Sequence, residues 1–161
     1  MTDSYVDVYG LHGTSKDIAE DIVCGGFELS KDGYYGNGVY FYEDNSKGRL
    51  YACNWAGKKY DAVSIVKANL YFHESLYLDL TDPDIHLREV IRALSKSGDN
   101  VPFNLVAKKI LKLVLSDVER KQNIHFQLVK VLVPEGSHNG WDYGYVAKDI
   151  RIIKDKTILE L

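Results

Sequence analysis

The residues best suited to chemistry lie in the stretch LHGT, residues 11–14. A glycine directly after a predicted strand lets a ligand approach the main chain, whose N–H and C=O can pair with a carboxamide such as that of nicotinamide. His12 can bind a ribose hydroxyl without changing charge, and Thr14 can touch the same ligand or cap the following helix. The motif taken alone also fits an ordinary strand-to-helix turn in which His12 is bonded to a neighbour.

The stretch YYGNGVYFY, residues 34–42, offers a second set of candidates. Gly36 and Gly38 permit a close approach of the backbone, and the strand that follows exposes Tyr40 on one face. Tyr51 lies eleven positions later, in the next predicted helix, where its ring could face Tyr40 and sandwich a flat heterocycle. Core packing explains an isolated stretch of this kind equally well.

The elements that must position these residues follow from hydrophobic periodicity and capping. Strands are predicted at residues 5–11, 39–42, 62–72, 76–80, 124–134 and 143–153, and helices at 15–24 and 46–56. Thr14 or Ser15 is expected to cap the first helix and Asp44 or Asn45 the second. From residue 82 to about 121 the spacing becomes helical. This order lacks a regular βαβ alternation and predicts a mixed α+β fold.

Composition narrows the class of protein. The 161 residues suit one domain spanning 1–161, and a net charge of −3 with mixed signs shows no cationic stripe for nucleic acid or membrane. A small local basic patch would still suffice for a nucleic-acid substrate. Two cysteines make neither a disulfide framework nor a metal cluster, and neither a signal peptide nor a membrane span is recognisable. We therefore expect a cytoplasmic protein with no membrane partner and no metal.

Three motifs resemble those of the poly(ADP-ribose) polymerase group of ADP-ribosyltransferases, the diphtheria-toxin type. LHGT is similar to its H-G-T or H-G-S, YGNGVYF to Y-G-K-G-I-Y-F-A, and SKGRLYA to S-K-S-x-x-Y. The closing YGYVAKDIRIIKDKTILEL is similar to the last strand of that group, and GVYFYED resembles compact bacterial or phage members. The most specific similarity covers residues 9–56 and 141–161. It implies an α+β fold of two packed, mainly antiparallel sheets that form an NAD cleft, with residues 82–121 as a helical insertion.

The resemblance implies a role in NAD binding for residues of all three motifs: His12, Gly13, Thr14, Gly38, Tyr40, Gly48 and Tyr51. His12 would hold the adenosine-side ribose, and the main chain of Gly13 would clamp the nicotinamide carboxamide. Tyr40 and Tyr51 would stack on the nicotinamide ring.

Two positions depart from the family pattern. Gly48 stands where the family usually has a serine that contacts the carboxamide, and Gly144 aligns with the catalytic glutamate. Asp142, Glu43 or the acceptor itself could supply the missing carboxylate, although Asp142 also fits a loop charge and Glu43 a helix-start residue. The catalytic candidates are therefore His12, Tyr40, Asp142 and Glu43. His138, in the loop before the last strand, is a further candidate for acceptor docking.

The expected function is a mono-ADP-ribosyltransferase that uses NAD as substrate, releases nicotinamide and transfers ADP-ribose to a protein or nucleic-acid acceptor. Its compactness suits a toxin or phage-conflict factor with an antitoxin or regulator as partner. The alternative is a catalytically weak or inactive module that binds NAD or ADP-ribose and acts through a partner. An RNA 2′-phosphotransferase would want arginines beside His12 and more basic clusters, which the sequence lacks.

Overall fold

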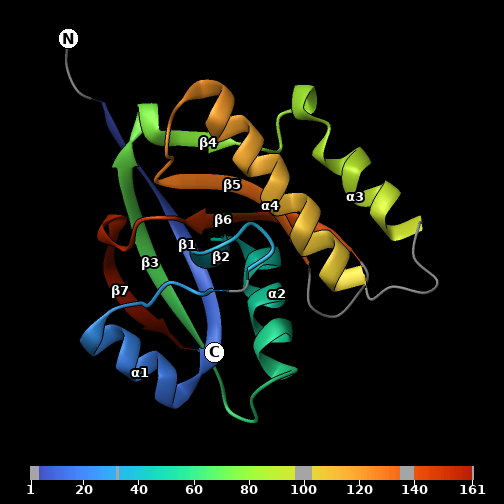
Figure 1. The fold of residues 1–161 in the computed structure, drawn as a ribbon. Helices are drawn as coiled ribbons and strands as arrows, with labels where there is room; N and C mark the ends of the chain where they lie inside the picture. Colours follow the sequence, from blue (N-terminus) through green and yellow to red (C-terminus); the bar gives the residue numbers. More distant parts are fainter. Residues whose placement is uncertain (1–3, 32, 97–102, 135–139, 161) are drawn as a thin grey trace.

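The computed structural model describes residues 4–31, 33–96, 103–134 and 140–160, and they form a mixed α+β fold (Figure 1). The strands are β1 (Tyr5–Ser15), β2 (Val39–Glu43), β3 (Val63–His73), β4 (Tyr77–Asp79), β5 (Leu128–Pro134), β6 (Trp141–Ala147) and β7 (Ile153–Leu159). The helices are α1 (Lys16–Gly25), α2 (Ser46–Gly57), α3 (Leu87–Lys96) and α4 (Phe103–Gln122). The predicted α+β class is confirmed.

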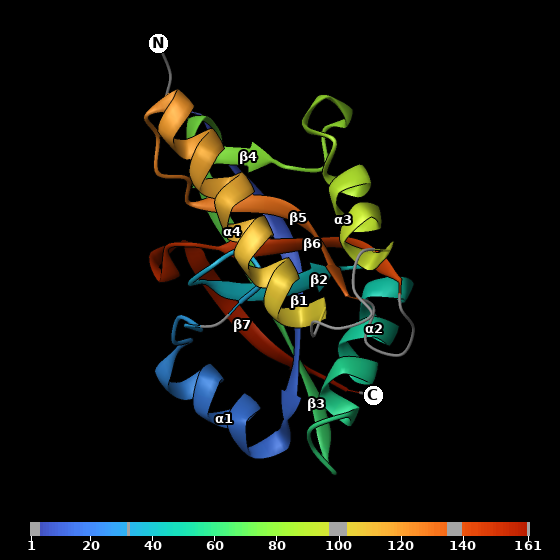
Figure 2. The same cartoon turned by 45° about the vertical axis from the view of Figure 1, so that its right-hand side comes forward.

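All of these strands belong to one sheet in the order β4-β5-β6-β2-β1-β3-β7, antiparallel except between β4 and β5. Helices cover both faces. One core joins Leu11 and Ile65 of the sheet to buried residues of α2, α3 and α4, and the other joins Phe41 and Val66 to α1. Figure 2 shows α4 lying across β5 and β6, with α1 at the opposite end of the molecule.

The expectation of two packed sheets was wrong, because β1 and β2 are hydrogen-bonded neighbours in a continuous sheet. Their junction is narrow, however. β1 pairs with β3 from Tyr5 to Ser15, whereas it pairs with β2 only through Gly10–Glu43 and Leu11–Tyr42. Beyond Leu11 the two strands diverge, and the sheet is split there without being divided into two.

Local capping explains where the helices begin. The Ser15 hydroxyl accepts the Ile18 N–H at the start of α1, and the Asn45 side chain accepts the Gly48 N–H at the start of α2. Ser15 and Asn45 are thus the caps, in preference to Thr14 and Asp44. The helical spacing from residue 82 to 121 corresponds to α3 and α4. No helix within the described ranges is both long and apolar enough to cross a membrane.

The single closing strand predicted at 143–153 is wrong, because the chain turns between β6 and β7. The Asp149 carboxylate accepts the Arg151 N–H and caps a 3-10 turn over Ile150–Ile152. This turn moves the chain from its pairing with β2 to a new position beside β3. A seventh strand, Ile153–Leu159, therefore closes the far edge of the sheet.

Candidate functional site

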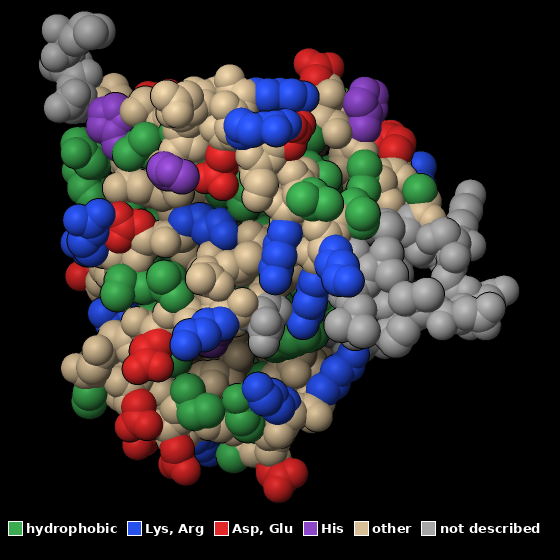
Figure 3. Space-filling model, viewed as in Figure 1, with side chains coloured by type: hydrophobic (Ala, Val, Ile, Leu, Met, Phe, Trp, Pro, Cys, Tyr) green, Lys and Arg blue, Asp and Glu red, His purple; other side chains and the backbone are tan. Residues whose placement is uncertain are grey.

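A cavity of about 730 Å³ opens where β1 and β2 diverge, a volume usual for small-molecule sites. It is lined from β1, α1, β2, the end of α2, α4 and the end of β5. The predicted site residues among its lining are His12, Gly13, Thr14, Gly38 and Tyr40. In Figure 3 the surface on this side is hollowed next to several Lys and Arg side chains. The structure therefore brings five of the nine predicted site residues to one cavity.

His12 bridges the two strands at the point where their ladder ends. Its Nδ1 lies 2.9 Å from the carbonyl oxygen of Tyr40, and as that carbonyl only accepts, Nδ1–H is the donor. Phe27 and Phe41 present ring edges to the imidazole at centroid distances of 5.2 and 6.0 Å. Burial lowers the pKa of His12, partly offset by the bond to Tyr40, so the ring is neutral at neutral pH and Nε2 is left as an acceptor.

Tyr40 is fixed by the turn that precedes its own strand. Its hydroxyl donates to the Gly36 carbonyl at 2.7 Å and accepts the Tyr35 N–H at 2.9 Å. Gly36 adopts φ 88°, which favours glycine, and a Cβ on Gly33 would fall 2.0 Å from the Tyr40 hydroxyl oxygen. Burial raises the pKa of Tyr40, so the hydroxyl stays protonated and can hold both bonds.

Two further side chains stabilise the same turn through hydrogen bonds. The Lys148 ammonium donates to the carbonyls of Tyr35 and Asn37, each at 2.7 Å, and the buried Tyr35 hydroxyl donates to the Leu132 carbonyl at 2.5 Å. Burial is the main cause that lowers the pKa of Lys148; the charge of Glu119 opposes this effect, and the smaller effect of Lys112 adds to it. The turn that forms one wall of the cavity is thus held by β2, β5 and the end of β6.

Gly13 and Gly48 allow α2 to pack closely on β1 and on the end of β2. A Cβ on Gly13 would lie 2.1 Å from the Ala52 carbonyl oxygen, and one on Gly48 would lie 1.7 Å from that of Glu43. Gly48 is buried at the start of α2 and is not among the residues that line the cavity. A side chain at position 48 would therefore have no space.

Tyr51 and Asp142 lie beside the cavity and contact each other. The Tyr51 hydroxyl is 3.4 Å from an Asp142 carboxylate oxygen, and its ring centroid is 6.0 Å from that of Tyr42, which does line the cavity. Tyr51 therefore stands beside Tyr42 and is not among the residues that line the cavity. Gly144 is packed in the sheet, since a Cβ there would lie 2.7 Å from the Phe41 carbonyl oxygen and from Val133 Cγ2.

Glu43 is not among the cavity residues. Its charge acts on Tyr77 and Tyr145, together with that of Asp79. Burial first, then these two carboxylates, raises the pKa of Tyr145 to about 12. Glu43 thus belongs to a group of acids and tyrosines near the cavity and not in it.

Sequence reasoning missed the charged residues that do line the cavity. Asp21 and Glu28 contribute carboxylates from the side of α1, and Lys59 and Lys108 contribute ammonium groups from the sides of α2 and α4. No local motif marks them, because each looks like a solvated residue of a helix or loop. His138 lies outside the described residues.

Neither a scan against protein-family models nor a search of curated proteins finds a match for this sequence. Within the described residues, no group of three or more His, Cys, Asp or Glu side chains could hold a metal ion. The assignment of a function therefore depends on the motifs and on the geometry of the cavity.

Proposed function

We propose that this protein is a mono-ADP-ribosyltransferase that binds NAD in the cavity between β1 and β2. The observation that carries the proposal is the convergence of His12, Gly13 and Tyr40, from two separate motifs, on one cavity of suitable volume. The motifs alone would be compatible with three unrelated turns. Their meeting at the end of the β1–β2 ladder supports the resemblance to the ADP-ribosyltransferases.

The stretch of β1 beyond Leu11, which pairs with β3 but not with β2, suits a carboxamide. In an antiparallel sheet every second residue directs both its N–H and C=O to the same neighbour. Beyond Leu11, β2 no longer pairs with the N–H and C=O groups that β1 directs toward it. We therefore expect these main-chain groups of β1 to be free to bind a ligand in the cavity. We expect the main chain near Gly13 to bind the nicotinamide carboxamide and neutral His12 to accept a ribose hydroxyl at Nε2.

Charges around the cavity suit the remainder of the dinucleotide. Lys59 and Lys108 can neutralise the pyrophosphate, because they line the same cavity from neighbouring elements. Breaking the nicotinamide–ribose bond develops oxocarbenium-like positive charge, which a carboxylate stabilises. Asp21 and Glu28 are the carboxylates of the described chain that line the cavity, and we assign this task to one of them in preference to Asp142 or Glu43.

The test is release of nicotinamide from NAD labelled in the nicotinamide ring. We expect release by the wild type, and a loss of about 10²-fold or more for His12→Ala and for either Glu28→Gln or Asp21→Asn. His125→Ala, at a fully exposed side chain, is the matched control and should match the wild type. Asp142→Asn and Glu43→Gln test the two earlier carboxylate candidates beside them.

Three outcomes separate the possibilities. Binding of NAD by calorimetry without release of nicotinamide supports the alternative, an NAD- or ADP-ribose-binding module that acts through a partner. Loss of release only in Asp142→Asn or Glu43→Gln assigns the carboxylate to that residue. Absence of both binding and release would refute the proposed function.

A further inference from the structure

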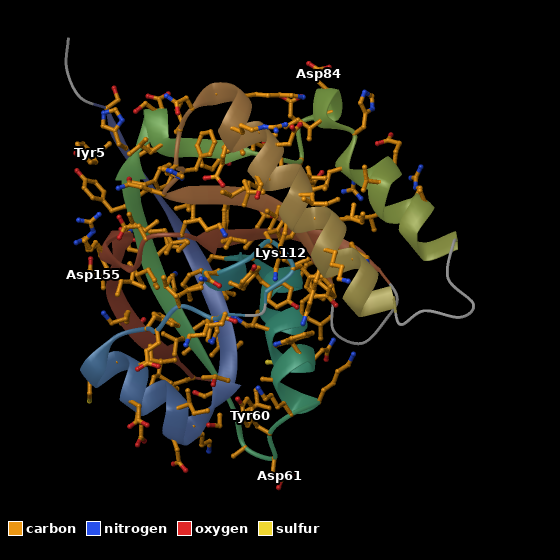
Figure 4. All side chains as sticks on the ribbon, viewed as in Figure 1. Tyr5, Tyr60, Asp61, Asp84, Lys112 and Asp155 are labelled. Atoms are coloured by element: carbon orange, nitrogen blue, oxygen red, sulfur yellow. The ribbon has the colours of Figure 1, made fainter. Side chains whose placement is uncertain are left out.

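Positive charge is concentrated on one part of α4. Lys108, Lys109 and Lys112 lie within five consecutive positions of α4, and we call them the α4 lysine row. Figure 3 shows Lys and Arg side chains together over α4 beside the hollowed surface, and Figure 4 labels Lys112 on this helix. The row begins inside the cavity lining with Lys108 and continues outside it with Lys109 and Lys112. Positive charge therefore extends beyond a ligand that fills the cavity.

The α4 lysine row takes no part in the ion pairs found between described residues. Of the carboxylates further along α4, Asp117 pairs with Arg120 and Lys121. The charge of Glu119 acts on Lys148 and raises its pKa. Lys112 also lies near the Lys148 ammonium, which lowers the pKa of Lys148. The row is thus a local excess of positive charge on an acidic protein.

Two of the ammonium groups that line the cavity lie close to aromatic rings. Lys108 Nζ lies 5.7 Å from the Tyr34 ring centroid, and Lys59 Nζ lies 5.6 Å from that of Tyr60. Trp55 is 47% exposed and lines the same cavity. A single strand of nucleic acid needs this combination, because its phosphates bind cations and its bases stack on exposed rings. An acidic peptide would use the lysines and leave the rings uncovered.

We propose that the acceptor of ADP-ribose is single-stranded nucleic acid, bound along the α4 lysine row with its target base at the cavity mouth. This inference rests on the proposed function. In the transfer, a nitrogen or oxygen of the strand forms a bond to the anomeric carbon of the nicotinamide-side ribose. The bond from that carbon to nicotinamide breaks, its electron pair leaves with neutral nicotinamide, and the acceptor proton passes to a carboxylate or to water.

The binding experiment uses a fluorescently labelled single strand of about 12 nucleotides, in DNA and RNA forms, followed by anisotropy. The test variant is Lys109→Glu/Lys112→Glu, since neither residue lines the cavity. The matched control is Lys154→Glu/Lys156→Glu on β7, which makes the same change of net charge. We expect the test variant to bind the strand about 10-fold or more weakly, with the slope of log K against log salt reduced by about 0.7 per lost phosphate contact. The control should bind like the wild type.

Calorimetry with NAD separates the two proposals. NAD binding that persists in both double variants, with strand binding lost in the test variant alone, supports the inference. Equal strand binding by the two double variants, or binding of an acidic peptide and not of the strand, overturns the inference and leaves the proposed function standing. Strand binding without NAD binding to the wild type refutes both. In the final step, label from adenine-labelled NAD must appear on the strand, and label confined to protein overturns the inference.

Discussion

β1 pairs with its two neighbouring strands, β3 and β2, to different extents. Toward β3 it is paired along its whole length, from Tyr5 to Ser15, and toward β2 it is paired at only two positions. The full ladder is backed by buried residues on both faces, including Leu11, Ile65 and Val66. The short ladder ends at His12, whose ring bonds to the Tyr40 carbonyl in place of a main-chain pair. The cavity between β1 and β2 is therefore present because the hydrogen-bonded ladder between these strands ends after two residue pairs.

The largest effect on this arrangement should come from Gly13→Ala. The new Cβ would lie 2.1 Å from the Ala52 carbonyl oxygen, so α2 must move away from β1 beside the cavity. We expect the free energy of unfolding in urea to fall by about 3 kcal/mol. The control is Gly57→Ala at the end of α2, where the atom nearest to the new Cβ would be 3.9 Å away. This variant should change the free energy of unfolding by less than about 1 kcal/mol. Equal stability of the two variants would mean that the packing of α2 on β1 does not require a glycine at position 13.

Tyr40→Phe should affect only the β2 side of β1, where the short β1–β2 ladder lies. The change removes the bond to the Gly36 carbonyl and leaves the Tyr35 N–H without its acceptor. We expect a loss of about 1–3 kcal/mol in unfolding free energy, together with weaker NAD binding. Tyr71→Phe, at a tyrosine that is 45% exposed on β3, is the matched control. If both variants behave alike in calorimetry and denaturation, the Tyr40 hydroxyl does not order the turn.

Lys148→Met tests the hydrogen bonds that Lys148 donates to the same turn. It keeps most of the side-chain volume and removes two charge-assisted bonds, to the carbonyls of Tyr35 and Asn37. Because Lys148 is only partly buried, we expect a loss of about 1 kcal/mol, with faster amide exchange at Gly38. Lys154→Met on exposed β7 should leave both measurements unchanged. Unchanged exchange in Lys148→Met would show that Tyr40 alone suffices to hold the turn.

The smallest effect should be the pH dependence that His12 confers. Its folded pKa is lowered by burial, so the unfolded chain takes up a proton first as the pH falls from neutral to about 5.5. Stability is therefore fully present above the unfolded value and decreases on acidification through that range. Thermal unfolding of the wild type and His12→Gln at both pH values measures this contribution as a difference. An identical pH dependence in the two proteins would contradict a buried, neutral His12.

The sequence predicted most elements, because their signals are local. Helix caps, the 3.6-residue spacing of α3 and α4 and the long apolar run of β3 are patterns of neighbouring residues. The join of β1 to β2 and the end of β6 depend instead on long-range pairing and on the turn at Asp149, which no local pattern specifies. The predictions of two sheets and of one closing strand failed for that reason.

The candidate site divides in the same way. His12, Gly13 and Tyr40 were identifiable because motifs mark them, and the structure brings them together. The carboxylate was sought at Asp142, beside Gly144 in the chain, and at Glu43, at the end of the tyrosine strand, whereas the carboxylates that line the cavity are Asp21 and Glu28. Only the fold brings α1 and Tyr40 to the same cavity, so no local sequence pattern could mark Asp21 and Glu28 as site residues.

The position of Trp55 gives the protein an optical reporter. The chain has two tryptophans, and one of them, Trp55, is 47% exposed on the wall of the cavity. The other, Trp141, already packs edge-on against Tyr34 at a centroid distance of 5.1 Å. A molecule that covers Trp55 will change its intrinsic fluorescence, and a Trp55→Phe variant isolates that signal from Trp141. Occupancy of the cavity can thus be followed without attaching a dye.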